Sequence, residues 1–374
     1  MIKRHYNLDN LIEKSKVLII YGPRRVGKTT LLNDFLSRSK LKYKLDSGDN
    51  IRVQQILGSQ DFNQIIEYAE NYELLAIDEA QQIPGIGMGL KILVDQIPEL
   101  VIIATGSSSF DLAQKVGEPL TGRKKTIILY PFSQIELLEK FNRFELKENL
   151  EEFLIFGSYP EVIIAKNRQK KIDILSELVN SYLLKDVLSL EKIKSSSQLF
   201  DLLKLIAFQV GNEVSLNELA TQVKLDVKTV IRYLDILEKS FVIIKIGGFS
   251  RNLRKEVVSK AKYYFLDNGV RNAVISQFNN FADRNDIGAL FENFLFAERL
   301  KNNAFKQCLT SMYFWRTYDG QEIDLVEEKE GKLCAFEFKL SEKNKKKEPK
   351  DWKKKYPKAK YKIINRENYL DFLM

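Results

Sequence analysis

The sequence predicts an α/β protein with three modules, and three patterns lead to this prediction. A glycine-rich loop at residues 22–29 follows an apolar, β-rich run and precedes a run of helix formers. Further along, two helical segments are separated by a short turn and followed by two strands. Near the C-terminus, two strand-like segments carry acidic residues and a lysine. The chain has 374 residues, of which 44% are hydrophobic, so length and composition allow each module a core of its own.

The glycine-rich loop reads Gly22-Pro23-Arg24-Arg25-Val26-Gly27-Lys28-Thr29 and matches the phosphate-loop pattern at every fixed position. Val17 to Tyr21 is typical of a strand and Thr30 to Phe35 of a helix, so the loop lies at a strand-to-helix turn. In this context backbone N–H groups surround phosphates, while Lys28 would reach the outer phosphates and Thr29 would hold Mg²⁺. We therefore predict that ATP binds to this loop and to the residue after it, Thr30.

The next two predicted strands supply partners for the loop. Residues 73–79 form an apolar run that ends in Asp78 and Glu79; Asp78 would hold the Mg²⁺ shell and Glu79 would polarise the attacking water. Paired acids at the end of a strand also cap helices, but the complete phosphate loop favours the nucleotide role. The strand Leu100 to Ala104 ends at Thr105-Gly106-Ser107-Ser108-Ser109, where a hydroxyl, Ser107 in our prediction, could contact the terminal phosphate. A serine-rich turn that caps the next helix explains the pattern equally well.

Five shorter motifs accompany the phosphate loop: Ile77-Asp78-Glu79-Ala80, Ala104-Thr105-Gly106-Ser107, Leu120-Thr121-Gly122-Arg123, Tyr130-Pro131-Phe132-Ser133 and Gly157-Ser158-Tyr159-Pro160-Glu161. Over residues 1 to about 270 the chain resembles the prokaryotic AAA-type P-loop ATPases. The resemblance is to the archaeal and bacterial group whose ATPase precedes a winged helix and a C-terminal domain of unknown function. It implies that an arginine entering the strand after the sensor strand reaches the γ-phosphate, often that of a neighbouring subunit.

Arg123 stands in the position of that arginine, before the predicted strand Thr126 to Tyr130. The resemblance thus implies a catalytic role for Arg123 and self-association through it. A solvent-exposed charge beside Lys124 and Lys125 is the alternative.

Composition excludes several classes of protein. No apolar run reaches the roughly 18 residues that a membrane span needs, and the N-terminus lacks the apolar stretch of a signal peptide. We therefore expect a cytoplasmic protein with no membrane partner. The two cysteines, Cys308 and Cys334, are too few for a disulfide framework. His5 is the only histidine, which excludes zinc-finger sites, so any metal is held by oxygen.

The positive charge is concentrated near the C-terminus. Residues 343–362 contain eleven lysines against Glu348 and Asp351, a surplus of nine that equals the net charge of +9 of the whole chain. Trp352 and Tyr356 lie four residues apart on the expected helix Pro349 to Tyr356, so the segment should be folded with one apolar face. A folded lysine face is a candidate for binding nucleic acid phosphates, although a solvated surface is the simpler explanation.

The middle of the chain is predicted to be helical up to about residue 210. Apolar spacing predicts four helices, in Ile135 to Phe141, Leu150 to Phe156, Ile172 to Leu190 and Leu199 to Val210. Gly157-Ser158-Tyr159-Pro160 interrupts them. We expect these helices to form a lid that closes over the nucleotide and then a bridge to the next module.

Residues 214–234 have the spacing of a helix-turn-helix. The first helix opens with Ser215 as cap and Glu218 three residues later, and the second begins at Asp226 after a four-residue turn. The strand Phe241 to Ile246, a Gly-Gly turn and the strand Lys262 to Leu266 follow, which predicts a winged helix. Its side chains that could face a major groove are Lys224, Lys228, Thr229 and Arg232. A packing or protein-docking role is equally open, and Asp226 at the helix start also weakens the DNA interpretation.

The last hundred residues contain a second group of charged residues. A predicted helix carries Glu292, and two predicted strands carry Asp324 and the pair Glu337 and Lys339; these elements span Ile287 to Leu300, Gln321 to Val326 and Leu333 to Lys339. Residues two apart in a strand project from the same face, and Asp324 on the neighbouring hairpin strand can lie beside them. Two carboxylates and a lysine on one sheet face are unusual unless they hold a cation.

This arrangement resembles the restriction-endonuclease-like fold, which has an acid on a helix, an Asp on the second strand and Glu-x-Lys on the third. The resemblance implies that Glu292, Asp324 and Glu337 bind Mg²⁺ and that Lys339 orients or activates the water that attacks a phosphodiester. The proline usual before the Asp is absent, and Glu322-Ile323 stands there instead. Solvated charges at strand ends are the alternative.

The predicted fold class is α/β, with an AAA-type P-loop NTPase domain and its helical lid, a winged helix-turn-helix and a restriction-endonuclease-like α/β domain. We expect the ATPase core at 1–133, the lid and bridge at 134–195, the winged helix at 196–270 and the nuclease-like domain at 271–374. The predicted function is an ATPase that acts on DNA, with ATP and Mg²⁺ as cofactors and with Glu79, Arg123 and Lys339 as catalytic residues. The alternative is an ATP-driven switch or a DNA- or protein-binding module whose C-terminal domain does not cleave.

Overall fold

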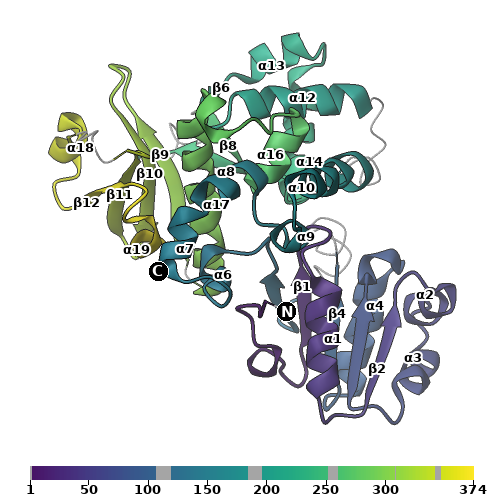
Figure 1. Ribbon diagram of the computed structural model, residues 1–374. Coiled ribbons are helices and arrows are strands. Elements are labelled where there is room, and N and C mark those ends of the chain that lie inside the picture. The colour runs from purple at the N-terminus through teal and green to yellow at the C-terminus, as the bar shows by residue number, and fades with distance from the viewer. Residues whose placement is uncertain (1, 107–118, 184–195, 252–259, 308, 342–346) are drawn as a thin grey trace. The chain divides into compact units, whose positions relative to one another are not determined.

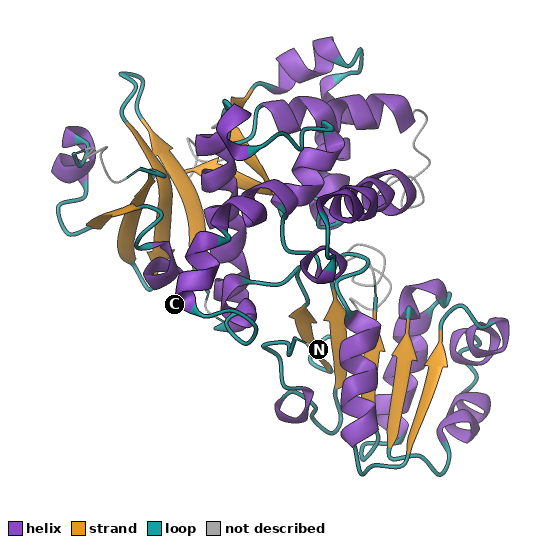
Figure 2. Ribbon diagram, viewed as in Figure 1, coloured by secondary structure: helices purple, strands orange, loops and turns teal. Residues whose placement is uncertain are grey.

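The computed structural model describes residues 2–106, 119–183, 196–251, 260–307, 309–341 and 347–374 (Figure 1). The chain forms two compact units. The N-terminal unit comprises residues 4–131 and 239–241, and the C-terminal unit comprises residues 1–3, 132–238 and 242–374. Figure 2 shows that each unit is built around its own β-sheet.

A five-stranded parallel sheet forms the core of the N-terminal unit, with the strand order β2-β3-β4-β1-β5. Its strands are β1 Val17–Tyr21, β2 Tyr43–Ser47, β3 Leu74–Asp78, β4 Val101–Thr105 and β5 Lys124–Ile128. Its helices are α1 Lys28–Arg38, α2 Ile51–Gly58, α3 Phe62–Ala69 and α4 Ile86–Gln96. The strands β1, β3 and β4 are buried almost throughout, as their apolar runs predict for a parallel sheet covered on both faces.

The predicted strands at 17–21, 73–79 and 100–104 are confirmed to within a residue at each end. The strand expected at 126–130 instead begins at Lys124, because it pairs with β1 from Val17 onward. All five strands run the same way, so their carboxyl ends meet at one edge of the sheet, with β4 between β1 and β3.

A seven-stranded mixed sheet runs through the C-terminal unit in the order β12-β11-β10-β9-β7-β8-β6. Its strands are β6 Glu213–Val214, β7 Ile243–Gly248, β8 Ala261–Phe265, β9 Ser311–Arg316, β10 Glu322–Lys329, β11 Lys332–Phe338 and β12 Lys360–Ile364. β7 pairs antiparallel with β8 and parallel with β9, so the strands expected in the winged helix and those of the C-terminal segment belong to one sheet.

The predicted Gly-Gly turn after the first wing strand is wrong. Gly247 and Gly248 lie inside β7 and pair with Tyr313 and Phe314 of β9. Two adjacent glycines usually mark a turn. Here a strand from far along the chain supplies their hydrogen-bond partners, which a local pattern cannot reveal.

The helices of the C-terminal unit lie before, between and after these strands. They are α6 Gln134–Leu137, α7 Arg143–Glu148, α8 Leu150–Phe156, α9 Pro160–Ile164, α10 Arg168–Glu177, α12 Ser196–Phe208, α13 Leu216–Gln222, α14 Val227–Lys239, α16 Asn268–Val274, α17 Ile287–Phe305, α18 Lys350–Lys355 and α19 Tyr369–Leu373. The helices predicted at 150–156, 199–210, 287–300 and 349–356 are confirmed in position. The helix predicted at 135–141 ends at Leu137, and the one predicted at 172–190 continues as a π-helix from Leu178 to Leu183, with its remainder outside the described residues.

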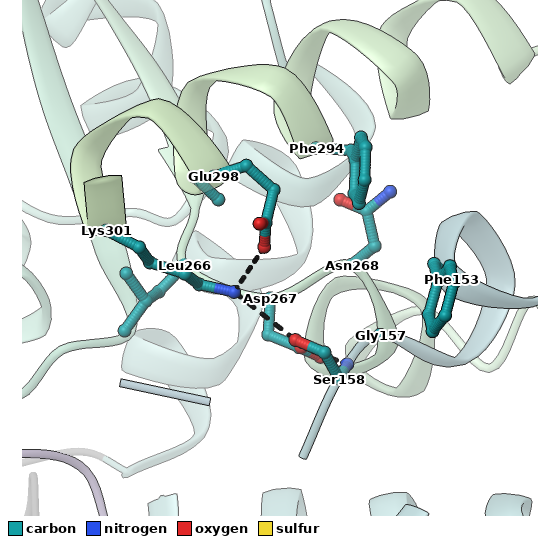
Figure 3. A pocket seen from close by; sticks show the side chains of 10 residues that line it. Phe153, Gly157, Ser158, Leu266, Asp267, Asn268, Phe294, Glu298 and Lys301 are labelled. Carbon is teal, nitrogen blue, oxygen red and sulfur yellow. Dashed lines mark hydrogen bonds and ion pairs between the residues drawn. The ribbon is translucent and has the colours of Figure 1, made fainter. Parts of the chain in front are cut away.

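A buried polar network joins the expected lid segment to the C-terminal part of the same unit (Figure 3). Lys301 on α17 is only 1% exposed. Its ammonium lies 2.7 Å from a carboxylate oxygen of Glu298 and donates to the Phe132 carbonyl at 3.1 Å and to the Ser158 hydroxyl at 3.2 Å. The Ser158 N–H donates to Asp267 at 2.7 Å. These bonds hold residues 132–158 against α17 and the start of α16.

Gly157 and the amides of α16 complete this junction. A Cβ at Gly157 would lie 2.0 Å from an Asp267 carboxylate oxygen, so only glycine fits there. The side-chain amides of Asn268 and Asn272 donate to the Leu154 carbonyl of α8 at 3.2 and 3.1 Å. The segment therefore packs within the C-terminal unit, and its closure over a nucleotide stays a prediction.

Candidate functional site

The phosphate-loop sequence lies between β1 and α1, at the carboxyl edge of the parallel sheet. Gly22 adopts φ 149°, and a Cβ there would lie 2.1 Å from the Leu129 carbonyl oxygen of the neighbouring chain segment. Gly27 adopts a left-handed conformation with φ 92° and caps α1, whose first residue is Lys28. The two fixed glycines of the motif thus meet backbone requirements that other residues would strain. Residues 23–26 form the loop between them, and Thr29 and Thr30 are exposed in the first turn of the helix.

Lys28 is drawn back over the loop that precedes it. Its ammonium donates to the carbonyls of Gly22 and Pro23, each at 2.9 Å, and the residue is only 5% exposed. A positive charge is therefore held at the start of α1, where the helix dipole also favours an anion.

Asp78, at the end of β3, connects the loop to the neighbouring strands. The Thr29 hydroxyl donates to one of its carboxylate oxygens at 2.8 Å. The Thr105 hydroxyl, at the end of β4, donates to the other oxygen. The hydroxyl and the carboxylate are the hard oxygen donors that Mg²⁺ prefers, so Thr29 and Asp78 fit the predicted metal shell.

Glu79 is oriented by contacts from two sides. Its backbone is left-handed with φ 50°, and its N–H donates to the Thr105 hydroxyl at 3.1 Å. The side-chain amide of Gln81, which is buried, donates to the Glu79 carboxylate. Gln81 and Thr105 were not among the predicted site residues. The strand pattern located the end of β4, but only the tertiary structure shows which of its hydroxyls contacts the acids; Ser107, the predicted one, lies outside the described residues.

Arg123 lies away from the phosphate loop of its own chain. It immediately precedes β5, and its carbonyl accepts from Val17 at the amino end of β1, whereas the loop follows the carboxyl end of β1. Its guanidinium lies 2.6 Å from a carboxylate oxygen of Asp95 at the end of α4. A catalytic role for Arg123 would therefore have to be exerted on a neighbouring subunit, and this role stays a prediction.

The C-terminal unit brings the second predicted group of residues together. Leu325 of β10 and Phe336 of β11 are the last pair in the β10–β11 ladder. Asp324 directly precedes Leu325, and Glu337 directly follows Phe336. Asp324 accepts from the Phe338 N–H at 2.7 Å, and Lys339, one residue past β11, lies 2.8 Å from Glu337. Glu337 is fully buried. The expected proximity of Asp324, Glu337 and Lys339 is thus present.

Glu292 on α17 lies at this site together with two residues of β8. It accepts from the Tyr264 hydroxyl at 2.6 Å and lies 3.6 Å from the ammonium of Lys262. Lys262, which is 2% exposed, also lies 2.6 Å from Glu322. Sequence reasoning missed Lys262 and Tyr264, because nothing local distinguishes them from other residues of a predicted strand.

The electrostatics of the site follow from burial and from the surplus of carboxylates. Burial first, and then Glu292 and Glu337, raises the pKa of Asp324 to about 8. Burial also raises the pKa of Glu292, although Lys262 opposes the shift. Burial disfavours the charge of Lys339, but its hydrogen bond with Glu337 and the other nearby carboxylates outweigh this and raise its pKa.

The fit of this second site to a metal ion is incomplete. Glu337 is paired with Lys339, and Glu292 with Lys262 and Tyr264. Across the part of the chain that the structure describes, no group of three or more His, Cys, Asp and Glu side chains is placed to hold a metal. Metal binding by Glu292, Asp324 and Glu337 stays a prediction.

From Lys347 onward the lysine-rich segment is folded, as its two aromatic residues predicted. Trp352 on α18 is fully buried, and its ring centroid lies 5.3 Å from that of Trp315 and 4.5 Å from that of Tyr356. The eight lysines of the segment that the structure describes are all exposed; they are Lys347, Lys350, Lys353, Lys354, Lys355, Lys358, Lys360 and Lys362. Lys343, Lys345 and Lys346 lie outside the described residues.

The two helices predicted at 214–234 are present with their four-residue turn, as α13 and α14. The predicted cap is also present, since Ser215 accepts from the Glu218 N–H at 3.4 Å. Lys224, Lys228 and Arg232 are exposed. The Thr229 hydroxyl instead donates to Asp226 at 2.6 Å and so belongs to the cap of α14.

Among the described residues, no helix has both the length and the apolar character needed to cross a membrane.

Comparison with known families divides the chain into three parts. Residues 14–138 match the family described as an AAA domain. Residues 147–280 and 287–372 match two families, each described as a domain of unknown function. The first match supports an AAA-type ATPase domain in the N-terminal unit. The other two assign no function, so the winged helix and the restriction-endonuclease-like domain stay predictions.

Two uncharacterized relatives match most of the chain. The chain is 26% identical over 362 residues to an uncharacterized protein of Methanocaldococcus jannaschii, covering 91% of this chain and 78% of that protein. It is 27% identical over 368 residues to an uncharacterized protein of Haemophilus influenzae, covering 90% and 88%. Among solved structures, RuvB of Thermotoga maritima is similar over 61% of this chain and 81% of that one, with 18% identity and a TM-score of 0.32.

Proposed function

We propose that the N-terminal unit binds ATP with Mg²⁺ and hydrolyses it. The observation that supports this most strongly is the set of bonds around Asp78, which joins Thr29 of the phosphate loop to Thr105 at the end of β4. The AAA-domain match over residues 14–138 supports it independently.

Each residue has a role that follows from its chemistry. The N–H groups at the start of α1 and the Lys28 ammonium would bind the β- and γ-phosphates. Thr29 and Asp78 would hold Mg²⁺, which neutralises phosphate charge when bound. Glu79, oriented by Gln81 and Thr105, would accept a proton from the attacking water.

Two substitutions separate binding from turnover. Lys28→Ala should abolish ATP binding, since backbone N–H groups alone do not offset the polyphosphate charge, whereas Glu79→Gln should bind ATP and lose turnover. Binding is measured by titration with a fluorescent ATP analogue and turnover by phosphate release. Lys40→Ala, an exposed lysine just beyond α1, serves as the control. Normal hydrolysis by Lys28→Ala would refute the proposal.

A second candidate function is action on nucleic acid by the C-terminal unit. It rests on the juxtaposition of Asp324, Glu337 and Lys339 and on the pairing of β11 with the lysine-bearing strand β12. In this proposal the lysines hold the phosphate backbone and Lys339 positions the water that attacks a phosphodiester. The competing proposal is a switch, in which ATP turnover gates contacts with DNA or a protein and the unit does not cleave.

Incubation with plasmid and single-stranded DNA separates these two. The nuclease is supported if the chain cleaves DNA only with Mg²⁺ or Mn²⁺ and if Asp324→Asn and Lys339→Ala lose this cleavage. ATP hydrolysis should be unaffected in both variants, and the control Glu330→Gln should cleave like the parent chain. The switch is supported if the chain cleaves neither DNA nor RNA in any nucleotide state and if Lys28→Ala alters its binding of DNA or of a protein.

A further inference from the structure

A groove of about 700 Å³ lies within the C-terminal unit, apart from both sites described above. It is lined by the exposed side of α14, by the end of β6 and the start of α13, and by residues of β7 and β8. Its volume falls within the range of about 300–1,000 Å³ found for ligand clefts. Neither ATP binding nor the acidic site involves its residues.

The wall formed by α14 is apolar at helical spacing. Val227, Ile231 and Leu234 all line the groove, and they stand four and then three residues apart. Residues at this spacing form one stripe along a helix. Ile231 is 48% exposed in the middle of the helix, next to Arg232. Val227 is half-buried and Leu234 is only 3% exposed, so solvent reaches this stripe at Val227 and Ile231, which offer an apolar surface for the apolar stripe of another helix.

Four cations line the groove beside this stripe. Lys228 and Arg232 line the groove from α14, and Lys245 and Lys260 line it from β7 and the start of β8. Two carboxylates, Asp235 and Glu238, also line it, at the C-terminal half of α14. The lining residues thus carry a surplus of two positive charges around an apolar centre, and one of the cations, Lys260, also lies 3.8 Å from Glu213.

This combination disfavours nucleic acid as the occupant. A phosphate backbone gains nothing from an apolar stripe, whereas an amphipathic helix with acidic flanks uses both the stripe and the cations. Asp226 adds a further negative charge at the start of α14, the end that would approach bases in a helix-turn-helix. The hydrogen bonds from Thr229 lower the pKa of Asp226 and keep it ionised.

We propose that this groove binds an acidic amphipathic helix of a partner protein. The apolar stripe of that helix would pack against Val227 and Ile231. Its acidic residues would meet Lys228 and Arg232 of α14, and Lys245 of β7 and Lys260 just before β8. The mode is that of a helix laid into a groove, with charge complementarity setting the choice of partner.

Two synthetic helices provide the test. Both are about four turns long and carry leucines at the same i, i+3, i+4 and i+7 positions; the remaining positions are mainly Glu in one and mainly Lys in the other. Their binding to the full chain is measured by fluorescence anisotropy, beside a duplex DNA of about 20 base pairs. The acidic helix should bind at least about tenfold more tightly than the basic one, and more weakly as salt rises.

Variants then locate the binding in the groove. Ile231→Asp should weaken the acidic helix by about tenfold or more, whereas Ile164→Asp, an exposed isoleucine on α9 outside the groove, should not. Lys228→Glu with Arg232→Glu should reverse the preference toward the basic helix. Circular dichroism confirms that each variant is folded.

Three results would overturn the proposal. The first is that the acidic helix binds no better than the basic one, or that neither binds. The second is that the charge reversal leaves the preference unchanged. The third is that the parent chain binds the duplex DNA and the Lys228→Glu, Arg232→Glu double variant loses this binding, which would make the groove a nucleic acid surface. None of these results bears on ATP hydrolysis, so the proposed ATPase function is tested separately.

Discussion

Gln81 contacts Glu79, the proposed catalytic base of the nucleotide site. It is buried and its amide donates to the Glu79 carboxylate, while the left-handed backbone of Glu79 is held by Thr105. A base that is free to rotate spends less time aligned with water, so the orientation of Glu79 should affect turnover more than binding.

We predict that Gln81→Ala lowers kcat for ATP hydrolysis by about tenfold or more, with little change in KM. Gln81→Glu should be at least as damaging, because a second carboxylate would repel Glu79. Steady-state kinetics measures both, and Gln82→Ala, the exposed neighbour, is the control. Equal kcat values for Gln81→Ala and Gln82→Ala would show that Gln81 does not position Glu79.

Asp324 should make stability depend on pH. Burial, then Glu292 and Glu337, raises the pKa of its carboxyl to about 8, so the folded chain keeps a proton that the unfolded chain releases near pH 4. This carboxyl's contribution to stability is therefore present at low pH and is lost as pH rises from about 4 to about 8. In Asp324→Asn the group no longer titrates.

Thermal unfolding without divalent cations checks this prediction. Between about pH 5 and pH 8, Tm should fall less in Asp324→Asn than in the parent chain, and Glu330→Gln should behave like the parent. An identical fall in all three chains would mean that Asp324 has an ordinary pKa in the folded state.

At the scale of elements, α18 shows how a highly charged segment is kept folded. The buried ring of Trp352 packs against Trp315 of β9, Tyr356 and Phe249, and Asp351 accepts from the Gln321 side chain at 2.7 Å. These contacts anchor one face of the helix, so the lysines of the opposite face are displayed at fixed positions. A fixed array is better suited to phosphates than a disordered tail because less conformational entropy is lost on binding.

Neutralising Lys347, Lys353, Lys354 and Lys355 to Gln should weaken DNA binding equally for unrelated sequences. It should also reduce the slope of log K against log salt by up to roughly four, if all four lysines contact duplex phosphates. Filter binding across a salt series measures the slope. The same change at Lys140, Lys166, Lys170 and Lys306, four exposed lysines elsewhere in the unit, is the control. An unchanged slope would identify the segment as a solvated surface.

At the scale of the whole molecule, the position of Arg123 has a consequence for assembly. It lies at the amino end of β5, at the opposite edge of the sheet from the phosphate loop. A chain therefore cannot use its own Arg123 on its own ATP. If this arginine contributes to catalysis, a second copy must supply it, and each active site is shared between two chains.

Mixing inactive variants tests this shared site. Arg123→Ala and Lys28→Ala should each lose at least about tenfold in turnover when pure. A mixture of the two should regain turnover, because an intact phosphate loop on one chain meets an intact arginine on another. Asp95→Ala, which removes the partner of Arg123 within the chain, is the control. A mixture as inactive as its components would exclude the shared site.

The sequence alone determined those features in which the physics is local. The phosphate loop, the strands β1, β3 and β4, the cap of α13 and the buried face of α18 depend on residues a few positions apart, so spacing and residue type sufficed to predict them. The juxtaposition of Asp324, Glu337 and Lys339 was also predictable, because the alternation of a hairpin constrains which residues share a face.

Only the tertiary structure decided which distant segments meet. Gly247 and Gly248 form a strand because β9 supplies their partners. Lys262 reaches the acidic site because β8 lies in the same sheet as β10, and the expected lid helices are joined to α17 by a buried lysine network. Such contacts depend on long-range pairing and on the satisfaction of buried charges, and no pattern within a short stretch of sequence contains that information.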